Sequence, residues 1–275
     1  MALNTKSTTT AAVETVSRDR LRGRKLKAPK VIAVSNSLRA TYVAGGFVPP
    51  EKCRVLGAGS SNGVSPDRFT VTDEVAAEAA LLRKTLGIPE DARVIGFAGR
   101  MVHDKGITFL LDAYDRIRWE LDAHLVLVGD DLAGDRVDPA TRDRVTALDQ
   151  AHVLPRMSEL APFYAMLTVL AFPSLREGFP NVPVECGLCE RPVVGFRSTG
   201  VVDAVWDGVT GRIVDHDAQQ LAEALLAYLR DPALVAAHGA AARDRCLQEL
   251  APEAVWTAWF GEYRRLLAVR DLPLP

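Results

Sequence analysis

Several signatures of common enzyme classes are missing from this sequence. No GxGxxG follows an apolar run and no GxxxxGK occurs, which argues against a dinucleotide-cofactor site and a P-loop. The five histidines form no HxH or HExxH pattern, and we expect no metal site. No uninterrupted apolar run approaches the length of a membrane span, and residues 1–17 hold no signal-like apolar stretch. We therefore expect a cytoplasmic protein.

Cysteine is scarce, with four in 275 residues. Cys186 and Cys189 match CxxC, but they fall inside a predicted helix with no second pair at zinc spacing. We therefore expect them to pack in the core. The composition is 48% hydrophobic and 25% charged, with a formal net charge of −2, which argues against both disorder and bulk nucleic-acid binding.

The most informative segment that is present contains two glutamates eight positions apart, Glu177 and Glu185. The apolar run 168–172 before them predicts a buried strand, and Asn181 is a good N-cap for a helix that follows. A strand, a tight loop and a helix N-terminus direct backbone N–H groups at an anion above the sheet. Because carboxylates repel phosphate, the two glutamates suit sugar hydroxyls, and the segment predicts a nucleotide-sugar site. The alternative is a pair of solvated surface glutamates.

A second segment places two cations beside glycines. The apolar run 94–98 is followed by Gly99 and Arg100, and Lys105-Gly106 stands before a helical pattern. The carboxyl ends of parallel strands are where open α/β sheets bind ligands. Arginine offers a planar fork for phosphate oxygens and lysine a mobile charge. Solvated charges are a weaker interpretation, because cations are unfavourable at a helix N-terminus unless an anion is present.

Together these segments resemble the family-4 retaining glycosyltransferases. The shared motifs are Gly99-Arg100-x4-Lys105-Gly106 and Glu177-Gly-Phe-Pro-Asn followed by Glu185, and the similarity runs from about residue 30 to the C-terminus. Further stretches agree: Val31-Ile-Ala-Val-Ser35, Leu125-Val-Leu-Val-Gly129, Arg191-Pro-Val-Val-Gly195 and Asp207-Gly-Val-Thr-Gly211. The resemblance implies the GT-B fold, in which two Rossmann-like domains face each other and the C-terminal one binds the donor.

The resemblance also implies roles for individual residues. Glu177 would hold hydroxyls of the donor sugar and Glu185 the ribose, with retention at the anomeric carbon and no metal or other cofactor. Arg100, Lys105 and nearby backbone N–H groups would stabilise the leaving diphosphate. We predict Arg100, Lys105 and Glu177 as catalytic residues. The predicted substrate-binding residues are Glu185, Gly99, Gly178, Phe179, Pro180, Asn181 and Val182. Pro180 departs from the family's usual glycine or alanine and removes one N–H donor.

Length limits how much of a two-domain enzyme is present. We divide the chain into a basic, partly disordered leader (1–30), a remnant of an acceptor-binding domain (31–56), a nucleotide-sugar-binding Rossmann-like domain (57–250) and a C-terminal helix and tail (251–275). The remnant is predicted as one strand and one helix. The main domain is predicted as an α/β fold, a parallel sheet with helices on both faces. Its strands fall near 93–98, 124–128, 150–154, 168–172, 192–196 and 211–214.

Two regions outside the predicted domain suggest contacts. Residues 18–30 are strongly basic and could touch anionic headgroups at the inner membrane face or an acidic partner, or form a solvated helix. In the family the last helix crosses onto the N-terminal domain. Here the predicted helix 252–268 has little to cross onto, which predicts that Trp259, Phe260 and Tyr263 are partly exposed.

The leading hypothesis is the donor-binding part of a glycosyltransferase that moves a hexose-type sugar to a saccharide, lipid-linked or small-molecule acceptor. A truncated gene, a separate acceptor-binding subunit or a homodimer would each account for the missing domain. A non-catalytic nucleotide-sugar-binding module is the alternative, and an NAD-dependent oxidoreductase is disfavoured by the missing glycine motif. The sequence does not identify the donor's base, its sugar or the acceptor.

Overall fold

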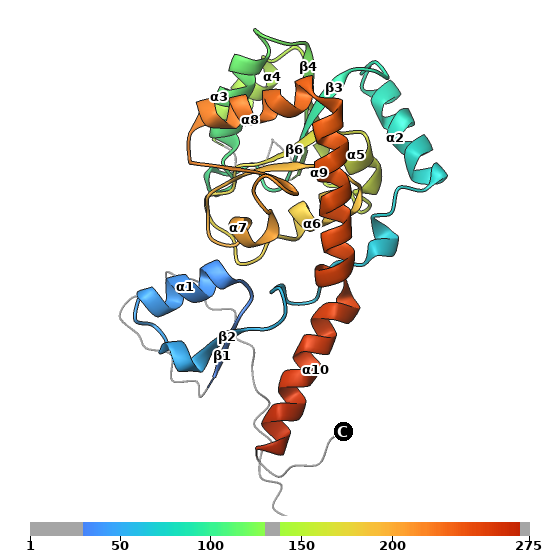
Figure 1. Cartoon of the computed structure of the whole chain (residues 1–275). Helices are drawn as coiled ribbons and strands as arrows, with labels where there is room; N and C mark the ends of the chain where they lie inside the picture. Colours follow the sequence, from blue (N-terminus) through green and yellow to red (C-terminus); the bar gives the residue numbers. More distant parts are fainter. Residues whose placement is uncertain (1–29, 130–137, 270–275) are drawn as a thin grey trace, which may run out of the picture.

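The computed structural model describes residues 30–129 and 138–269, and residues 1–29, 130–137 and 270–275 lie outside the description (Figure 1). Its main body is a six-stranded, all-parallel sheet with the order β5-β4-β3-β6-β7-β8. The strands are β3 (Arg93–Ala98), β4 (Ala123–Gly129), β5 (Ala151–Pro155), β6 (Val169–Phe172), β7 (Val193–Phe196) and β8 (Gly211–Val214). The predicted α/β fold and all six predicted strands are confirmed.

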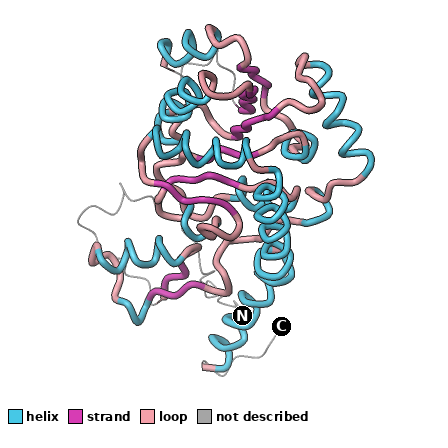
Figure 2. Tube along the Cα trace, turned by 45° about the horizontal axis from the view of Figure 1, so that its top comes forward, coloured by secondary structure: helices cyan, strands magenta, loops and turns pink. Residues whose placement is uncertain are grey.

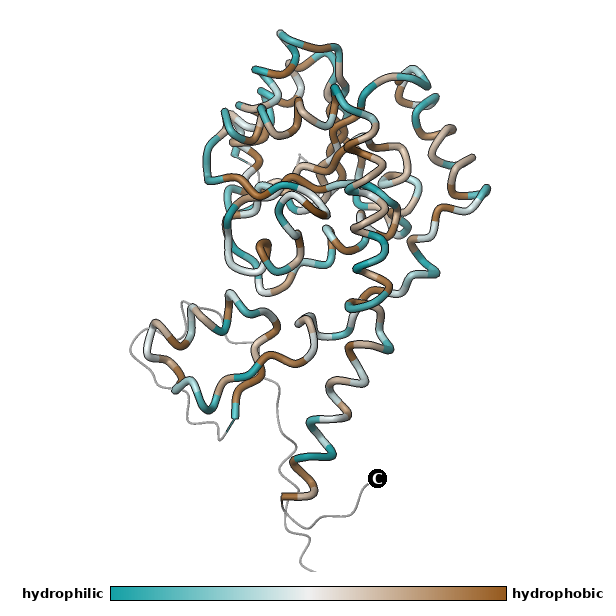
Figure 3. Tube along the Cα trace, in the orientation of Figure 1, coloured by the Kyte–Doolittle hydropathy of each residue, from teal (hydrophilic) through white to brown (hydrophobic). Residues whose placement is uncertain are grey.

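Helices cover both faces of this sheet, as the alternation of buried side chains requires. Ile95, Phe97 and their neighbours pack against α3 (Ile107–Ile117) and α8 (Ala218–Arg230). Val94 and Ala98 point to the other face, with α2 (Asp73–Thr85), α5 (Ala161–Ala165) and α6 (Asn181–Leu188). Figure 3 shows the hydrophobic residues concentrated along these strands. The remaining helices of the body are α4 (Pro139–Thr146), α7 (Val201–Ala204) and α9 (Pro232–Arg245).

The order of the strands reverses between β3 and β6. The chain runs outward from β3 through β4 to β5, returns to β6 beside β3, and then runs outward the other way to β8. The βα loops on either side of such a reversal diverge and leave a crevice at the carboxyl ends of the two strands. The predicted motifs after β3 and after β6 therefore flank the point where this kind of sheet binds ligands.

A small second unit precedes the main body. It consists of β1 (Val31–Ala33), α1 (Asn36–Ala44) and β2 (Cys53–Val55), and its two strands form a parallel pair (Figures 1 and 2). Its buried core is Ala33, Val48 and Cys53. The helix α10 (Pro252–Ala268) leaves the body and runs past this unit, where Glu262 pairs with Arg54 at 3.2 Å.

The aromatic residues of α10 are exposed as expected. Phe260 is 62% and Tyr263 47% exposed, and Trp259 is half-buried. Trp256, at 49%, adds a fourth ring to the same helix. Across residues 30–129 and 138–269, none of the helices combines the length and the hydrophobicity that crossing a bilayer would require.

Three local predictions need correction or are settled by the structure. Asn181 is not the N-cap of α6, because that helix begins at Asn181 and the capping position is held by Pro180. The remnant contains a second strand, β2, which the sequence analysis missed. Its three residues are too few to show a periodic pattern, and they pair with β1, which is distant in the sequence. All four cysteines are free and buried, so the prediction of core packing for Cys186 and Cys189 is confirmed.

Two histidines on neighbouring strands predict a loss of stability in mild acid. His124 Nδ1 and His152 Nε2 lie 3.1 Å apart with stacked rings. Burial lowers the pKa of both, and Arg83 lowers that of His124 further while Asp122 partly offsets this. The unfolded chain therefore takes up protons below about pH 6.5 before the folded chain does. The free energy of unfolding should fall on the order of 1 kcal/mol from pH 7.5 to 5.5.

Urea unfolding at both pH values measures this loss. The variant His152→Gln should lose clearly less stability on acidification than the wild type, because one buried imidazole no longer titrates. The exposed His103→Gln is the matched control and should behave like the wild type. Equal losses in all three proteins would show that the pair does not cause the effect.

Candidate active site

The loops after β3 and β6 are held together by a glycine that admits no side chain. Gly106 has a φ of +72°, and a Cβ there would lie 2.0 Å from the carbonyl oxygen of Pro173. Leu175 N donates to Asp104 O at 2.9 Å across the same contact. The sequence therefore brings Lys105 against the loop that follows β6.

Lys105 and Glu177 form an ion pair at this contact. The Lys105 ammonium donates to Glu177 Oε1, and the buried Ser174 hydroxyl donates to the same oxygen at 2.7 Å. The two charged side chains are only 21% and 15% exposed. Because Ser174 and Lys105 orient one oxygen, Glu177 Oε2 has no partner among the described residues and can accept from a ligand hydroxyl.

The loop from Gly178 to Val182 presents backbone donors beside this pair. No side chain caps α6, because Pro180 in the capping position has no polar group, so the N–H groups of Asn181 and Val182 stay free. The N–H groups of Gly178 and Phe179 likewise donate to no backbone or side-chain acceptor in the described part of the chain. Asn181 is exposed, and the Phe179 ring packs on the core next to Gly59. This end of the helix has free donors and a positive dipole end for an anion.

Glu185 lies one turn into α6 and makes a different contact. Its Oε2 accepts from the hydroxyl of Tyr164, a fully buried side chain, at 2.8 Å. Burial raises the pKa of Glu185, and the Tyr164 hydrogen bond and the charge of Arg68 partly offset this. The carboxylate is therefore oriented before any ligand arrives, with Oε1 left to accept a further hydrogen bond.

Removal of the Tyr164 hydroxyl should raise the pKa of Glu185 further. In Tyr164→Phe the carboxylate loses a donor that favours its charged form, while the burial that disfavours this form remains. NMR titration of carboxyl-labelled glutamate measures the change, with Glu185→Gln identifying the signal. Phe163→Leu, which alters the neighbouring buried ring, is the control for repacking. An unchanged or lower pKa in Tyr164→Phe would contradict the assignment.

The four predicted charged residues all lie at the carboxyl edge of the sheet, but only two of them touch. Arg100 follows β3 directly, is exposed, and has no side-chain partner in the described residues. Gly99 connects it to β3 and donates to Val128 O at 2.9 Å. The structure therefore joins Lys105 to Glu177, and leaves Arg100 and Glu185 at separate positions around them.

Sequence reasoning missed several polar residues around these groups. Ser174, Tyr164, Ser35 and Asp203 all contact the glutamates, the loop after Glu177 or the elements that support it. Ser35 and Ser174 each follow a strand, so their position at the carboxyl edge was available as a signal. Tyr164 and Asp203 lie on helices and carry no comparable local pattern.

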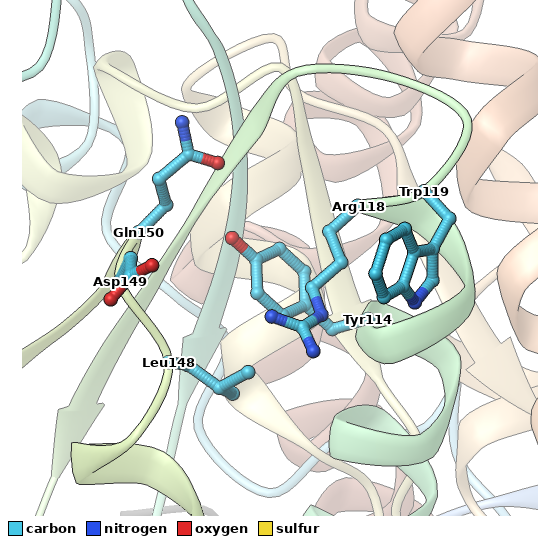
Figure 4. Close-up of a pocket in the computed structure, with 6 residues that line it drawn as sticks. All are labelled: Tyr114, Arg118, Trp119, Leu148, Asp149 and Gln150. Carbon is cyan, nitrogen blue, oxygen red and sulfur yellow. The ribbon is translucent and has the colours of Figure 1, made fainter.

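A cavity of about 270 Å³ lies elsewhere, at the amino ends of β4 and β5. Figure 4 shows its lining, which is Tyr114, Arg118, Trp119, Leu148, Asp149 and Gln150. None of the predicted site residues is among them. Within residues 30–129 and 138–269, no three His, Cys, Asp or Glu side chains gather closely enough to hold a metal ion.

A doubly wound parallel sheet with cations, free N–H groups and carboxylates at its reversal point has the architecture of a nucleotide-binding domain. Comparison with known families is more specific. Residues 92–231, about half of the chain, match the family model described as glycosyl transferases group 1. The chain belongs to this family. The match runs from the start of β3 to the end of α8 and includes all four predicted charged residues.

Individual proteins to which the chain is similar include a glycosyltransferase and a sugar-phosphate synthase. The chain is 29% identical over 242 residues to "Capsular polysaccharide biosynthesis glycosyltransferase CapM" of Staphylococcus aureus, with 87% of this chain and 62% of that protein covered. It is also 29% identical over 260 residues to alpha-maltose-1-phosphate synthase of Mycobacterium tuberculosis, with 88% and 65% covered. The chain thus spans somewhat less than two thirds of the length of these relatives.

Solved structures confirm the fold. HepE from Anabaena, solved in complex with UDP-glucose, has a TM-score of 0.76 at 22% identity, covering 90% of this chain and 67% of its own. Sucrose-phosphate synthase from Thermosynechococcus elongatus has a TM-score of 0.73 at 27% identity, covering 88% and 59%. These structures cover about nine tenths of this chain, whereas the family model matches about half of it. The structural similarity therefore extends beyond residues 92–231.

Proposed function

We propose that this chain is the donor-binding part of a family-4, retaining glycosyltransferase that moves a hexose-type sugar from a nucleotide-sugar. The observation that carries the proposal is the Lys105–Glu177 pair where the strand order reverses, beside the uncapped start of α6. The fold neighbour HepE was solved with UDP-glucose, which supports a donor of this class.

The arrangement of charges suits the bond to be broken. Departure of a nucleoside diphosphate places negative charge on phosphate and positive charge on the anomeric carbon. Arg100, Lys105 and the free N–H groups of the Gly178–Val182 loop would stabilise the first charge, so we propose that no divalent metal is needed. Glu177 Oε2 would hold the sugar's hydroxyls and Glu185 Oε1 the ribose.

The acceptor site is not assigned to the described residues. We propose that a longer N-terminal part of the same protein, a separate subunit or a second copy of this chain completes it for a saccharide, lipid-linked or small-molecule acceptor, in the cytoplasm or at the inner membrane face. The two-stranded β1–β2 sheet and the exposed aromatic residues of α10 support this, since such surfaces are normally covered. The basic stretch 18–30, proposed to contact a membrane, lies outside the described residues except for Lys30.

Calorimetry with UDP-glucose and GDP-mannose tests the donor site. We expect one of the two to bind, and Arg100→Ala to weaken that binding about tenfold, as loss of a charged hydrogen bond would. Arg118→Ala changes an equally exposed arginine at the remote cavity and should leave the affinity unchanged. Failure of both donors to bind, or equal weakening by both substitutions, would refute the proposal.

A further inference from the structure

The N-terminus of α1 is capped by Ser35, whose hydroxyl accepts from Leu38 N at 3.2 Å, and also by Asp203, which lies 167 positions from Asn36 in the sequence. Asp203 Oδ1 accepts from Asn36 N at 2.8 Å, and Oδ2 accepts from Ser37 N at 3.2 Å and from the Ser37 hydroxyl. A carboxylate at a helix N-terminus satisfies N–H groups that lack partners within the helix and interacts favourably with its dipole. Asp203 therefore fastens the small N-terminal unit to the main body.

The other side of the same contact reaches the loop of Glu177. The Ser37 hydroxyl accepts from Gly200 N at 2.7 Å, and the preceding Thr199 accepts from Glu177 N at 3.0 Å. A Cβ at Gly200 would lie 2.6 Å from Gly178 O, which shows how closely this turn approaches the loop. The Ser35 hydroxyl makes a second direct contact between the N-terminal unit and this loop by donating to Gly178 O at 2.7 Å.

A buried arginine fixes the base of this arrangement. Arg245, 7% exposed, donates to the carbonyl oxygens of Asp203 and Ala204 at 2.6 and 2.7 Å. Its guanidinium also lies 4.3 Å from the ring centre of Trp206. Arg245 therefore fixes the end of α7, which carries Asp203. A shift of α1 is then passed through the Asp203 carboxylate to the loop that follows Glu177.

We propose that Asp203, Ser37 and Ser35 are positioning residues, here named the α1 latch, which set the backbone of Glu177 and Gly178 for the donor sugar. The inference rests on the proposed function for the role of Glu177 and extends it to residues of the N-terminal unit. None of the three side chains contacts Glu177 or Glu185 directly, and Ser35 contacts only the carbonyl oxygen of Gly178 in the loop between them. They act through Gly200, Thr199 and the carbonyl oxygen of Gly178.

The first test needs no ligand. In Asp203→Ala, hydrogen exchange of the Glu177 amide, which donates to Thr199 O, should accelerate at least tenfold, because the turn that holds this acceptor is released, while the amides of β4 stay unchanged. Asp215→Ala removes an exposed acid on the neighbouring edge of the sheet and is the matched control. Unchanged exchange in Asp203→Ala overturns the proposal, whatever the protein binds.

The second test separates positioning from a general loss of structure. Calorimetry of Asp203→Ala should give about a tenfold weaker affinity for the UDP-sugar or GDP-sugar that binds the wild type, and a clearly smaller loss for the free nucleoside diphosphate, which has no sugar to contact Glu177 and keeps the N–H donors after Gly178. Asp203→Asn keeps one acceptor oxygen and should recover part of the sugar-specific loss. Parallel weakening of both ligands would mean that Asp203 serves stability alone. If the wild type binds no donor, the proposed function fails and the exchange result still decides the latch.

Discussion

Lys105→Met is expected to lower sugar transfer, or donor hydrolysis, by about 10²–10³-fold, as loss of one preorganised charge near a developing anion commonly does. Methionine keeps the length of the side chain, so packing around Pro173 and Gly106 should persist. Two effects combine: the phosphate loses a cation, and Glu177 loses one of the two donors that orient its Oε1, the Ser174 hydroxyl being the other. Single-turnover kinetics measures the chemical step separately from binding.

The control for Lys105→Met is Lys84→Met, which changes an exposed lysine at the end of α2. It should retain full activity. A double-mutant cycle with Glu177→Gln adds the decisive comparison, because residues in direct contact couple by about 0.5–3 kcal/mol. Strictly additive losses would mean that the Lys105–Glu177 ion pair makes no contribution to the reaction.

The strands of the main sheet could be predicted from the sequence because each one is marked by residues that lie next to each other in the chain. Strands β3, β4, β6 and β7 are short apolar runs bounded by polar or breaker residues, which buried parallel strands require. Helix α10 also agrees with the prediction, since it spans 252–268 as expected. A parallel sheet then places Arg100, Lys105 and Glu177 at one edge with no further information.

The contacts within that edge could not be predicted, because they join residues far apart in the chain. Lys105 and Glu177 are 72 positions apart, and Ser37 and Asp203 are 166 apart. No local pattern indicates that a cation expected to meet phosphate also pairs with the carboxylate of Glu177. The capping error at Asn181 has the same origin, because the buried Pro180 takes the capping position and the helix starts at Asn181, one residue earlier than predicted.

The small N-terminal unit is the weakest part of the described structure in physical terms. Parallel strands are normally buried on both faces within larger sheets, whereas β1 pairs only with β2 and the pair shares three buried core residues. On α10, Trp256, Phe260 and Tyr263 recur at helical spacing and form one exposed aromatic face. Ala258 and Glu262 on the adjoining face of the helix contact Gly57 and Arg54 of the connection and β2.

Hydrogen exchange of the chain alone should therefore be strongly uneven. We expect amides of β1 and β2 to exchange about 10²–10⁴-fold faster than those of β3 and β4. A unit with so small a core opens at a free energy several kcal/mol below that of the main body, and each 1.4 kcal/mol is a factor of ten. Mass spectrometry of the exchanged peptides measures the ratio, with β7 as an internal control within the sheet. Uniform protection would show that the unit needs no further cover.

The dependence of amide hydrogen exchange in β1 and β2 on protein concentration shows whether a second copy of the chain packs against the N-terminal unit. If a second copy completes it, protection of β1 and β2 must rise with concentration, and Phe260→Glu must abolish the rise by placing a charge in the aromatic face. Trp119→Glu, which changes an 82% exposed tryptophan just beyond the C-terminal end of α3, should leave the rise intact. If protection stays low at every concentration, a second copy does not cover the unit, and a separate subunit or a further segment of the same protein must do so. Since the α1 latch joins this unit to the loop of Glu177, either one would also stabilise the donor site.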